Sequence, residues 1–311
     1  MSTPLEPAPE SLAAGRELYL KREDLHELGA FKWRGALPAL ERYRAEGARV
    51  VVTASTGNHG AATAWAAARL DLQAVVYAPA GASRTKLDHL ERLGAELRLV
   101  GADLDEAKEL ARAEAAERGL SFFEDGGEPA QYEGYAAIGD ELLSQLDRGP
   151  AAVVVPVGNG ALLAGVGRAI LQRSPETLRV GVVAAEAPVM ADSFEAGRPV
   201  RGDRSATFAD GLAVRVAIPY AVDALDDVAT HMLRVSEREL AQGVAAFAAA
   251  GIRVEGAAAA GLAALPQLHA ERDHRSACSF PCGPIVLIVT GRNIDETLFE
   301  RARRDPESFS A

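Results

Sequence analysis

Lysine is scarce in this sequence, where only four of the 33 basic residues, at positions 21, 32, 86 and 108, are lysines. Arginine carries the same charge and makes better forked hydrogen bonds, but it cannot lose its proton and attack a carbonyl group. A position that keeps lysine in such a chain is therefore a candidate nucleophile. Lys32 attracts most interest, because it lies between two aromatic residues and before an arginine in the stretch GAFKWRGA, residues 29–36.

Cysteine is also rare, with two residues, Cys278 and Cys282. Together with His274 they match no closed zinc-binding spacing. We therefore expect a polar loop with incidental thiols and no zinc site.

An excess of positive charge and long apolar runs are absent as well. The net charge is −11 and the isoelectric point is near 5.1, which argues against a broad surface for nucleic acids. No stretch is apolar for long enough to cross a bilayer, and the first residues have no basic segment that leads into an apolar core. These absences predict a cytoplasmic protein that binds neither nucleic acid nor a membrane.

The sequence does contain a regular alternation of short apolar runs and longer helical patterns, which is typical of a parallel sheet covered by helices. Helices are expected where Ala, Leu, Arg and Glu recur at helical spacing, at 60–70, 103–118 and 237–250. Strands are expected at 49–55, 73–79, 95–100, 151–157, 179–186 and 284–290. The predicted fold class is α/β, with open, mostly parallel sheets flanked by helices and arranged in two lobes.

A glycine-rich turn follows the strand expected at 151–157. The stretch VPVGNGALLAG, residues 155–165, brings several backbone N–H groups to a helix N-terminus, which suits a phosphate group. It lacks the Gly-Lys-Ser/Thr sequence of a Walker loop. Because such turns also serve other ligands or none, the stretch alone suggests a phosphate site without establishing one.

Two further strand ends carry polar residues. The stretch TASTGNHG, residues 53–60, gathers hydroxyl, amide and backbone donors that suit a carboxylate, although taken alone it is better explained as a capped helix start. Thr290, in LIVTGRNID, stands at the carboxyl end of a buried strand, where open α/β sheets bind their ligands.

In this order the stretches resemble the fold-type II family of pyridoxal-phosphate enzymes, and most closely the branch of threonine/serine dehydratases and serine racemases. The resemblance extends from about residue 17 to residue 295 and is carried by LYLKREDL with GAFKWRGA, STGNHG, VGNGALLAG, ATFADGLAV and VTGRN. It implies a two-lobed fold similar to the β subunit of tryptophan synthase. A large domain, residues 1–47 and 141–311, would bind pyridoxal phosphate, and a small domain, residues 48–140, would close over the substrate.

The resemblance also implies how the cofactor is held. Lys32 would bind pyridoxal phosphate as a Schiff base and, once displaced by the substrate, would remove the substrate's α-proton. Phe31 would pack against the ring, Asn58 would hydrogen-bond its phenolic oxygen, and Thr290 would face its pyridine nitrogen. Glu255 would lie near the cofactor, although the Pro or Ser that usually follows it is missing. The phosphate would bind to the backbone of Gly158, Asn159, Gly160, Ala161 and Leu162, where Asn159 and Ala161 replace two of the family's four glycines.

The same resemblance assigns the substrate carboxylate to Ser55, Thr56 and the backbone of Asn58 and His59. Racemases of the family have a serine acid/base at the place of Thr56, whereas typical threonine dehydratases have alanine there. Because Thr56 keeps a hydroxyl group, racemase activity is retained as an alternative.

A divalent-cation site is a less specific implication. Glu186, the carbonyl of Met190 and Asp192, in EAPVMAD, are spaced like the Mg²⁺ or Ca²⁺ site of racemases and some dehydratases. An acidic, solvated helix start explains these residues equally well.

The function that the resemblance favours is a lyase of amino-acid metabolism, a threonine/serine ammonia-lyase (dehydratase). It would remove water from L-threonine, L-serine or a related β-hydroxy amino acid and release a 2-oxo acid and ammonia. The alternatives are an amino-acid racemase, an enzyme like threonine synthase or diaminopropionate ammonia-lyase, and a protein that binds pyridoxal phosphate or an amino acid without catalysis. Trp33 argues against threonine synthase, which usually has Asp after its cofactor lysine. We also expect a homodimer, because members of the family usually dimerise.

Overall fold

The computed structural model describes residues 1–203, 205–270 and 283–310. The chain forms two compact units, which we call unit 1 (Met1–Phe31 and Tyr135–Ala311) and unit 2 (Lys32–Gly134). The expected zinc-free loop around His274, Cys278 and Cys282 lies outside the described residues.

Unit 1 is built on a six-stranded sheet with the order β1-β2-β10-β7-β8-β9. Strand β1 runs antiparallel to β2, and the other neighbouring pairs are parallel. The two central strands, β7 and β10, are buried along their whole length, as their uninterrupted apolar sequences predict. The strands are β1 Leu5–Pro7, β2 Leu18–Arg22, β7 Ala152–Pro156, β8 Leu178–Ala184, β9 His231–Val235 and β10 Ile285–Val289.

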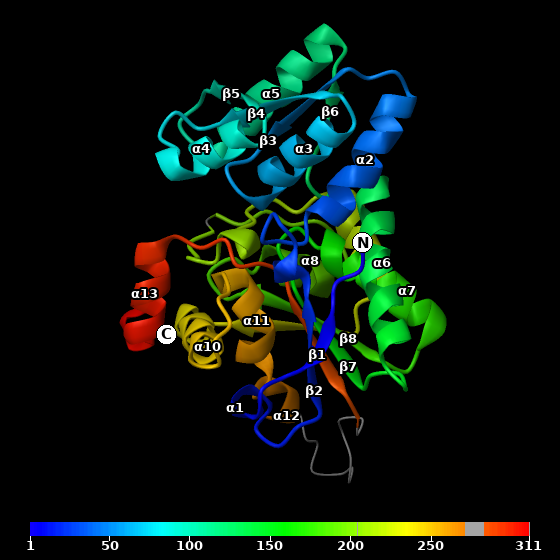
Figure 1. Cartoon of the computed structure of the whole chain (residues 1–311), viewed down its shortest axis with the longest axis vertical. Helices are drawn as coiled ribbons and strands as arrows, with labels where there is room; N and C mark the ends of the chain where they lie inside the picture. The colour runs from blue at the N-terminus through cyan, green and yellow to red at the C-terminus, as the bar shows by residue number, and fades with distance from the viewer. Residues whose placement is uncertain (204, 271–282, 311) are drawn as a thin grey trace. The chain divides into compact units, whose positions relative to one another are not determined.

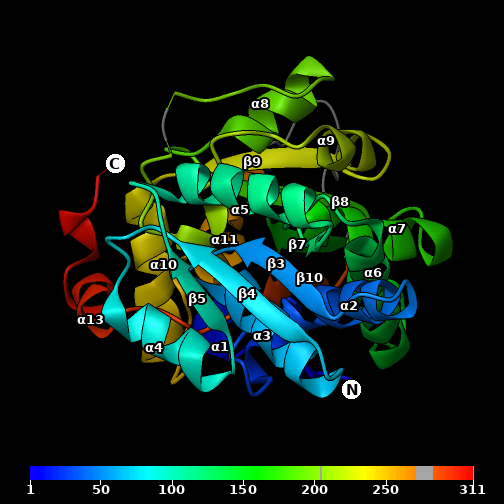
Figure 2. The ribbon, with the colours of Figure 1, turned by 90° about the horizontal axis from the view of Figure 1, so that it is seen from above.

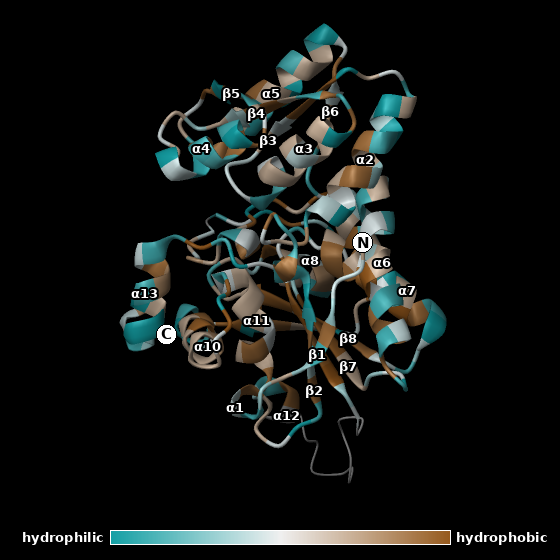
Figure 3. Cartoon of the chain, viewed as in Figure 1, coloured by the Kyte–Doolittle hydropathy of each residue, from teal (hydrophilic) through white to brown (hydrophobic). Residues whose placement is uncertain are grey.

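Helices cover both faces of this sheet. Helix α11 packs on one face and α7 on the other (Figure 1), and the strands between them are coloured hydrophobic in Figure 3, whereas α13 is largely hydrophilic. The helices of unit 1 are α1 Glu10–Ala13, α7 Ala161–Arg173, α8 Val189–Ala196, α9 Pro219–Asp226, α10 Glu237–Ala249, α11 Gly256–Ala264, α12 Gln267–Ala270 and α13 Glu296–Arg304, with 3-10 turns at Glu23–Leu25, Asp210–Leu212 and Pro306–Ser308.

Unit 2 has a parallel four-stranded sheet with the order β5-β4-β3-β6. Helices α5 and α3 lie on opposite sides of its central strands (Figure 2). Helix α5 buries Ala107, Ala111 and Ala115 against Val52 and Val75, because residues four apart share one face of a helix. The elements are α2 Trp33–Ala45, β3 Val50–Ala54, α3 Asn58–Arg69, β4 Gln73–Ala78, α4 Arg84–Arg92, β5 Glu96–Leu99, α5 Leu104–Arg118 and β6 Ser121–Phe122; α6, Pro129–Gln145, begins in unit 2 and ends in unit 1.

The predicted α/β class is confirmed, and each expected strand and helix is present within about two residues of its expected ends. The expected division of the chain differs from the observed one. Residues 32–47 were assigned to the large lobe, but the units change at Phe31 and Lys32, so α2 belongs to unit 2. The physical reason is that α2 packs along α3, where Trp33 meets the edge of Trp65 at 6.2 Å between ring centroids.

Candidate active site

Two strand ends of unit 1 carry the residues of the expected cofactor site. Strands β7 and β10 are parallel neighbours, so Gly158, after β7, and Thr290, after β10, leave the sheet at the same edge. The chain passes beside Thr290 again before α2, because the Phe31 N–H donates to the Thr290 carbonyl over 3.0 Å. The Phe31 ring packs against Tyr135, with 5.1 Å between the centroids.

The Thr290 hydroxyl is unusual for a buried group. The residue is 2% exposed, and its Oγ1 has no hydrogen-bond partner among the described residues. Leaving a buried hydroxyl unpaired costs about 1–3 kcal/mol. The buried hydroxyl therefore indicates that a bound ligand supplies the missing hydrogen-bond partner.

The turn between β7 and α7 depends on two glycines. A Cβ atom at Gly158 would lie 2.3 Å from the Gly211 carbonyl oxygen, and Gly160 has a φ of +93° that other residues rarely adopt. Between them, the side chain of Asn159 accepts a hydrogen bond of 3.1 Å from the Ala161 N–H. The turn thus presents backbone at the N-terminus of α7, where the helix dipole favours an anion.

Glu255 lies at the same edge of the sheet. Its N–H donates to the Gly291 carbonyl over 3.0 Å, and a Cβ atom at Gly291 would lie 2.8 Å from the Glu255 Oε1. The residue after Thr290 must therefore be glycine for the Glu255 carboxylate to keep its place.

Unit 2 holds the candidate nucleophile. Lys32 stands immediately before α2, and its Nζ donates to both carboxylate oxygens of Asp125, at 2.8 and 2.6 Å. The Gln131 amide donates to the same carboxylate over 3.2 Å. Burial alone would raise the pKa of Asp125, but the Lys32 ammonium, His59 and the hydrogen bond from Gln131 together outweigh burial and hold the pKa of this carboxyl well below its usual range.

His59 lies behind this ion pair. Its ring is buried, with Nδ1 3.6 Å from Asp125 Oδ1 and Nε2 3.0 Å from Thr53 Oγ1. Burial lowers the pKa of His59 more than Asp125 raises it, so the imidazole is neutral near neutral pH. The side chain of His59 therefore faces the Lys32 partner, whereas the sequence drew attention only to its backbone.

The turn between β3 and α3 carries the residues expected to bind a carboxylate. Ser55, Thr56 and Asn58 are partly exposed, and the Gly57 N–H donates to Ser55 Oγ over 3.1 Å. A Cβ atom at Gly60 would lie 2.9 Å from the Ser55 carbonyl, so the turn is tight. The first N–H groups of α3 have no partners within the helix, which makes this turn suitable for an anion.

Sequence reasoning missed Asp125. It follows strand β6, which runs parallel to β3, so it leaves the sheet of unit 2 at the same edge as the Ser55–His59 turn. The rule that ligands gather at the carboxyl ends of parallel strands points to Asp125 only once β6, a strand of two residues, is known. The neighbouring glycines gave it the composition of an ordinary solvated turn.

Two of the residues expected to bind a divalent cation have other contacts in the structure. The Asp192 carboxylate accepts a hydrogen bond of 2.8 Å from Arg234, Met190 is the second residue of α8, and the Glu186 carbonyl accepts the Ala206 N–H over 3.1 Å. Among the described residues, no group of three or more His, Cys, Asp or Glu side chains is arranged to hold a metal ion.

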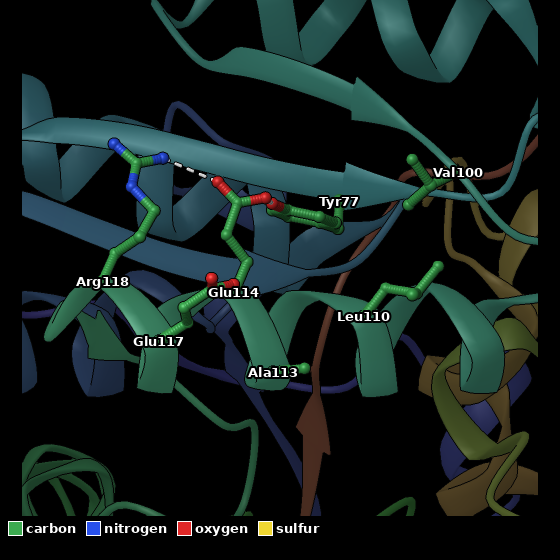
Figure 4. A pocket seen from close by; sticks show the side chains of 7 residues that line it. All are labelled: Tyr77, Val100, Leu110, Ala113, Glu114, Glu117 and Arg118. Carbon is green, nitrogen blue, oxygen red and sulfur yellow. Dashed lines mark hydrogen bonds and ion pairs between the residues drawn. The ribbon is translucent and has the colours of Figure 1, made fainter.

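A pocket on unit 2 lies apart from these candidate residues (Figure 4). It is lined by Tyr77, Val100, Leu110, Ala113, Glu114, Glu117 and Arg118. Glu114 contacts Tyr77 and Arg118 there. None of the residues expected to bind a cofactor or substrate lines it.

The sequence profile of the family described as pyridoxal-phosphate dependent enzyme matches residues 1–291. The chain belongs to this family.

The relatives of this pyridoxal-phosphate-dependent enzyme include ammonia-lyases. The chain is 32% identical to an L-threonine ammonia-lyase of Thermotoga maritima over 293 residues, covering 94% of the chain and 71% of the relative. It is 34% identical to an L-threonine ammonia-lyase of Geobacter sulfurreducens over 283 residues, covering 90% and 68%. The solved structure of the processed form of threonine deaminase isoform 2 from Solanum lycopersicum superposes with a TM-score of 0.90 at 29% identity, covering 99% of this chain and 89% of that one.

The observed residues fit pyridoxal phosphate. The Gly158–Gly160 turn offers backbone donors of the kind that bind a phosphate, Thr290 offers a buried hydroxyl that lacks a partner among the described residues, and Lys32 offers an amine. Of these groups, the Thr290 hydroxyl is the one whose hydrogen bonding the described residues leave incomplete.

Proposed function

We propose that this pyridoxal-phosphate enzyme is an ammonia-lyase that removes water from L-threonine, L-serine or a related β-hydroxy amino acid. The products would be a 2-oxo acid and ammonia. The names of its relatives support this assignment, since two of them at 32% and 34% identity are L-threonine ammonia-lyases.

The observation that carries the proposal is the buried Thr290 hydroxyl, which lacks a partner among the described residues. When bound, pyridoxal phosphate supplies an electron sink for the bond that breaks at the substrate's α-carbon. A neutral hydroxyl facing the pyridine nitrogen stabilises positive charge there less than a carboxylate would. Negative charge at the α-carbon is then weakly stabilised, which favours departure of a β-hydroxyl group as the α-proton leaves.

The remaining cofactor contacts are proposed on the same basis. The backbone of Gly158, Asn159, Gly160, Ala161 and Leu162 would bind the phosphate at the positive end of α7. Phe31 would pack against the ring, Asn58 would donate to the phenolic oxygen, and Glu255 would border the ring's edge.

Lys32 and the Ser55–His59 turn would act on the substrate. The turn, through Ser55, Thr56 and the backbone of Asn58 and His59, would bind the substrate carboxylate and so fix which face of the α-carbon is presented. The Lys32 amine would then take the α-proton onto its Nζ.

The test is an assay of the purified protein with added pyridoxal phosphate. Substrates would be L- and D-threonine, L- and D-serine, 3-hydroxyaspartate, diaminopropionate and phosphohomoserine, with 2-oxo acid, ammonia and inorganic phosphate measured. We expect 2-oxo acid from a hydroxy amino acid and none from the Lys32→Ala variant. Activity only with diaminopropionate or phosphohomoserine would replace the proposed substrate class, and no product from any substrate would favour a binding protein.

Racemisation is a second candidate activity, favoured by the partly exposed hydroxyl of Thr56. A hydroxyl on this turn could deliver a proton to the face of the α-carbon opposite the base. Chiral chromatography of the unreacted amino acid would detect it, and Thr56→Ala is expected to abolish racemisation while keeping elimination.

We also propose a Mg²⁺ or Ca²⁺ site at Glu186, the Met190 carbonyl and Asp192. Arg234 already occupies Oδ1 of Asp192, so the cation would bind through Oδ2 or compete with that ion pair. Addition of Mg²⁺ or Ca²⁺ to metal-free protein is expected to raise the melting temperature in the wild type but not in Asp192→Asn. The same melting curve with cation and with EDTA would contradict the site.

A homodimer in the cytoplasm is the proposed state and location of the protein. Sedimentation analysis would give the mass in solution. No helix among the described residues combines the length and apolar character that spanning a bilayer requires.

A further inference from the structure

We propose that Asp125, supported by His59 and Gln131, is a positioning residue for Lys32. It holds the lysine in place as an ammonium group whenever the amine is not attached to the cofactor. The inference rests on the proposed function only in taking Lys32 as the reactive amine.

The geometry of the ion pair is the first support. Both oxygens of Asp125 accept from one nitrogen, at 2.8 and 2.6 Å. The Lys32 and Asp125 side chains are 16% and 30% exposed, so water competes for these charges less than it does at a fully exposed pair. Lys32, Asp125, His59 and Gln131 all belong to unit 2.

The groups around Asp125 hold the carboxylate in this orientation. Gln131 is fully buried and donates to Oδ1, and its own carbonyl oxygen accepts the Gly126 N–H over 2.8 Å. His59 lies behind Oδ1 at 3.6 Å and is kept near Thr53. Gln131 and His59 therefore hold the Asp125 carboxylate in one orientation, in which it binds the amine.

The other charged groups nearby have partners of their own. Lys108 acts on His59 from a distance, but its Nζ pairs with Glu124 at 2.6 Å, and Glu124 also binds Arg112. Adjacent residues of one turn thus serve different cations: Glu124 binds Lys108 and Arg112, whereas Asp125 binds Lys32.

The contact has a chemical consequence for the amine. An ammonium nitrogen has no lone pair, so Lys32 cannot take a proton or attack a carbonyl while it is protonated. After Lys32 takes the α-proton, the proton moves from carbon to Nζ and the amine becomes an ammonium ion again. Asp125 would hold this ion, and it would hold Lys32 in the same way before the cofactor binds.

The test uses the scarcity of lysine in the chain. The cofactor-free protein is labelled with a trace of acetic anhydride at neutral pH, and mass spectrometry measures acetylation at each of the four lysines. Acetylation needs an amine nitrogen that the reagent can reach, and both oxygens of Asp125 contact the Lys32 Nζ. We therefore expect Asp125→Asn to raise the labelling of Lys32 relative to Lys86, and Asp125→Glu to restore most of the protection.

Glu124→Gln is the matched control, because it removes the neighbouring carboxylate. It is expected to raise labelling of Lys108 and to leave Lys32 at the wild-type level. Should Asp125→Asn fail to fold by circular dichroism, Asp125→Ser is measured with the same expected outcome.

Two results would overturn the proposal. One is an unchanged ratio of Lys32 to Lys86 labelling in a folded variant that lacks the Asp125 carboxylate. The other is an equal rise at Lys32 in Glu124→Gln, which would show a general effect of charge. Neither result bears on the lyase assignment, which depends on the product assay and the Lys32→Ala variant.

Discussion

Removing the hydroxyl group of Thr290 distinguishes a role in cofactor binding from a role in stability. Because its Oγ1 is buried and has no partner among the described residues, replacing it by a methyl group removes an unpaired polar atom. We expect Thr290→Val to leave the free energy of unfolding of the cofactor-free protein unchanged or to raise it by about 1 kcal/mol. The same variant should bind pyridoxal phosphate more weakly and form 2-oxo acid more slowly. Urea unfolding and equilibrium dialysis measure the two effects.

Thr177→Val is the matched control in the same unit. Thr177 is equally buried, but its hydroxyl donates to the Pro150 carbonyl over 2.6 Å. We expect this variant to lose about 1–3 kcal/mol of stability. If Thr290→Val lost as much in the absence of cofactor, its hydroxyl would have a structural role.

A second lysine of the chain, Lys21, is accounted for by its structural contacts and needs no catalytic role. Its side chain is fully buried, and its ammonium donates to the Thr3 carbonyl, to Glu141 at 2.7 Å and to Gln145 at 3.1 Å. The three acceptors surround one nitrogen and so match the three N–H donors of an ammonium group, whereas the planar guanidinium of arginine would not match them. Scarcity alone therefore does not mark a lysine as reactive.

At the scale of the element, the turn between β7 and α7 tolerates no side chain at its first glycine. A Cβ atom at Gly158 would lie 2.3 Å from the Gly211 carbonyl oxygen, so the segment that begins α7 would have to shift. We expect Gly158→Ala to lower the free energy of unfolding by about 1–3 kcal/mol and to weaken cofactor binding. Urea unfolding and dialysis against pyridoxal phosphate check both.

Gly81→Ala is the control for that variant, because a Cβ atom there would meet nothing within 4 Å. It is expected to change the free energy of unfolding by no more than about 0.5 kcal/mol and to leave the cofactor affinity unchanged. Normal cofactor binding in Gly158→Ala would mean that the turn does not hold the phosphate.

The sequence predicted the central elements well because burial on both faces leaves uninterrupted apolar runs, as in IVLIV of β10. It missed the peripheral strands for the opposite reason. Strand β2 contains Lys21 and Arg22, β9 is half-exposed at the edge of the sheet, and β6 has two residues. Charged or short strands lack the pattern that identifies the others.

The same limit applies to the candidate site. Lys32, Gly158 and Thr290 stand in recognisable local settings, so sequence patterns and family resemblance found them. Asp125 is connected to Lys32 only through the fold, across 93 positions of the chain. Contacts of that kind leave no local signal, since an acidic residue in a glycine-rich turn is usually solvated.

At the scale of the whole molecule, the division into units follows packing more closely than sequence order. The small domain was expected to end at residue 140, whereas unit 2 ends at Gly134. A Cβ atom at Gly134 would lie 1.9 Å from the Arg34 carbonyl oxygen. The start of α6 is thereby tied to α2, which is why both segments belong to unit 2.

The two tryptophans of the chain, Trp33 and Trp65, both lie in unit 2 and are almost fully buried. Tryptophan emission therefore reports on one unit alone, whereas far-ultraviolet circular dichroism sums the helices of both. Solvent reaching these rings shifts the emission even while unit 1 stays folded. The chain thus carries a built-in optical probe of unit 2, which also contains Lys32.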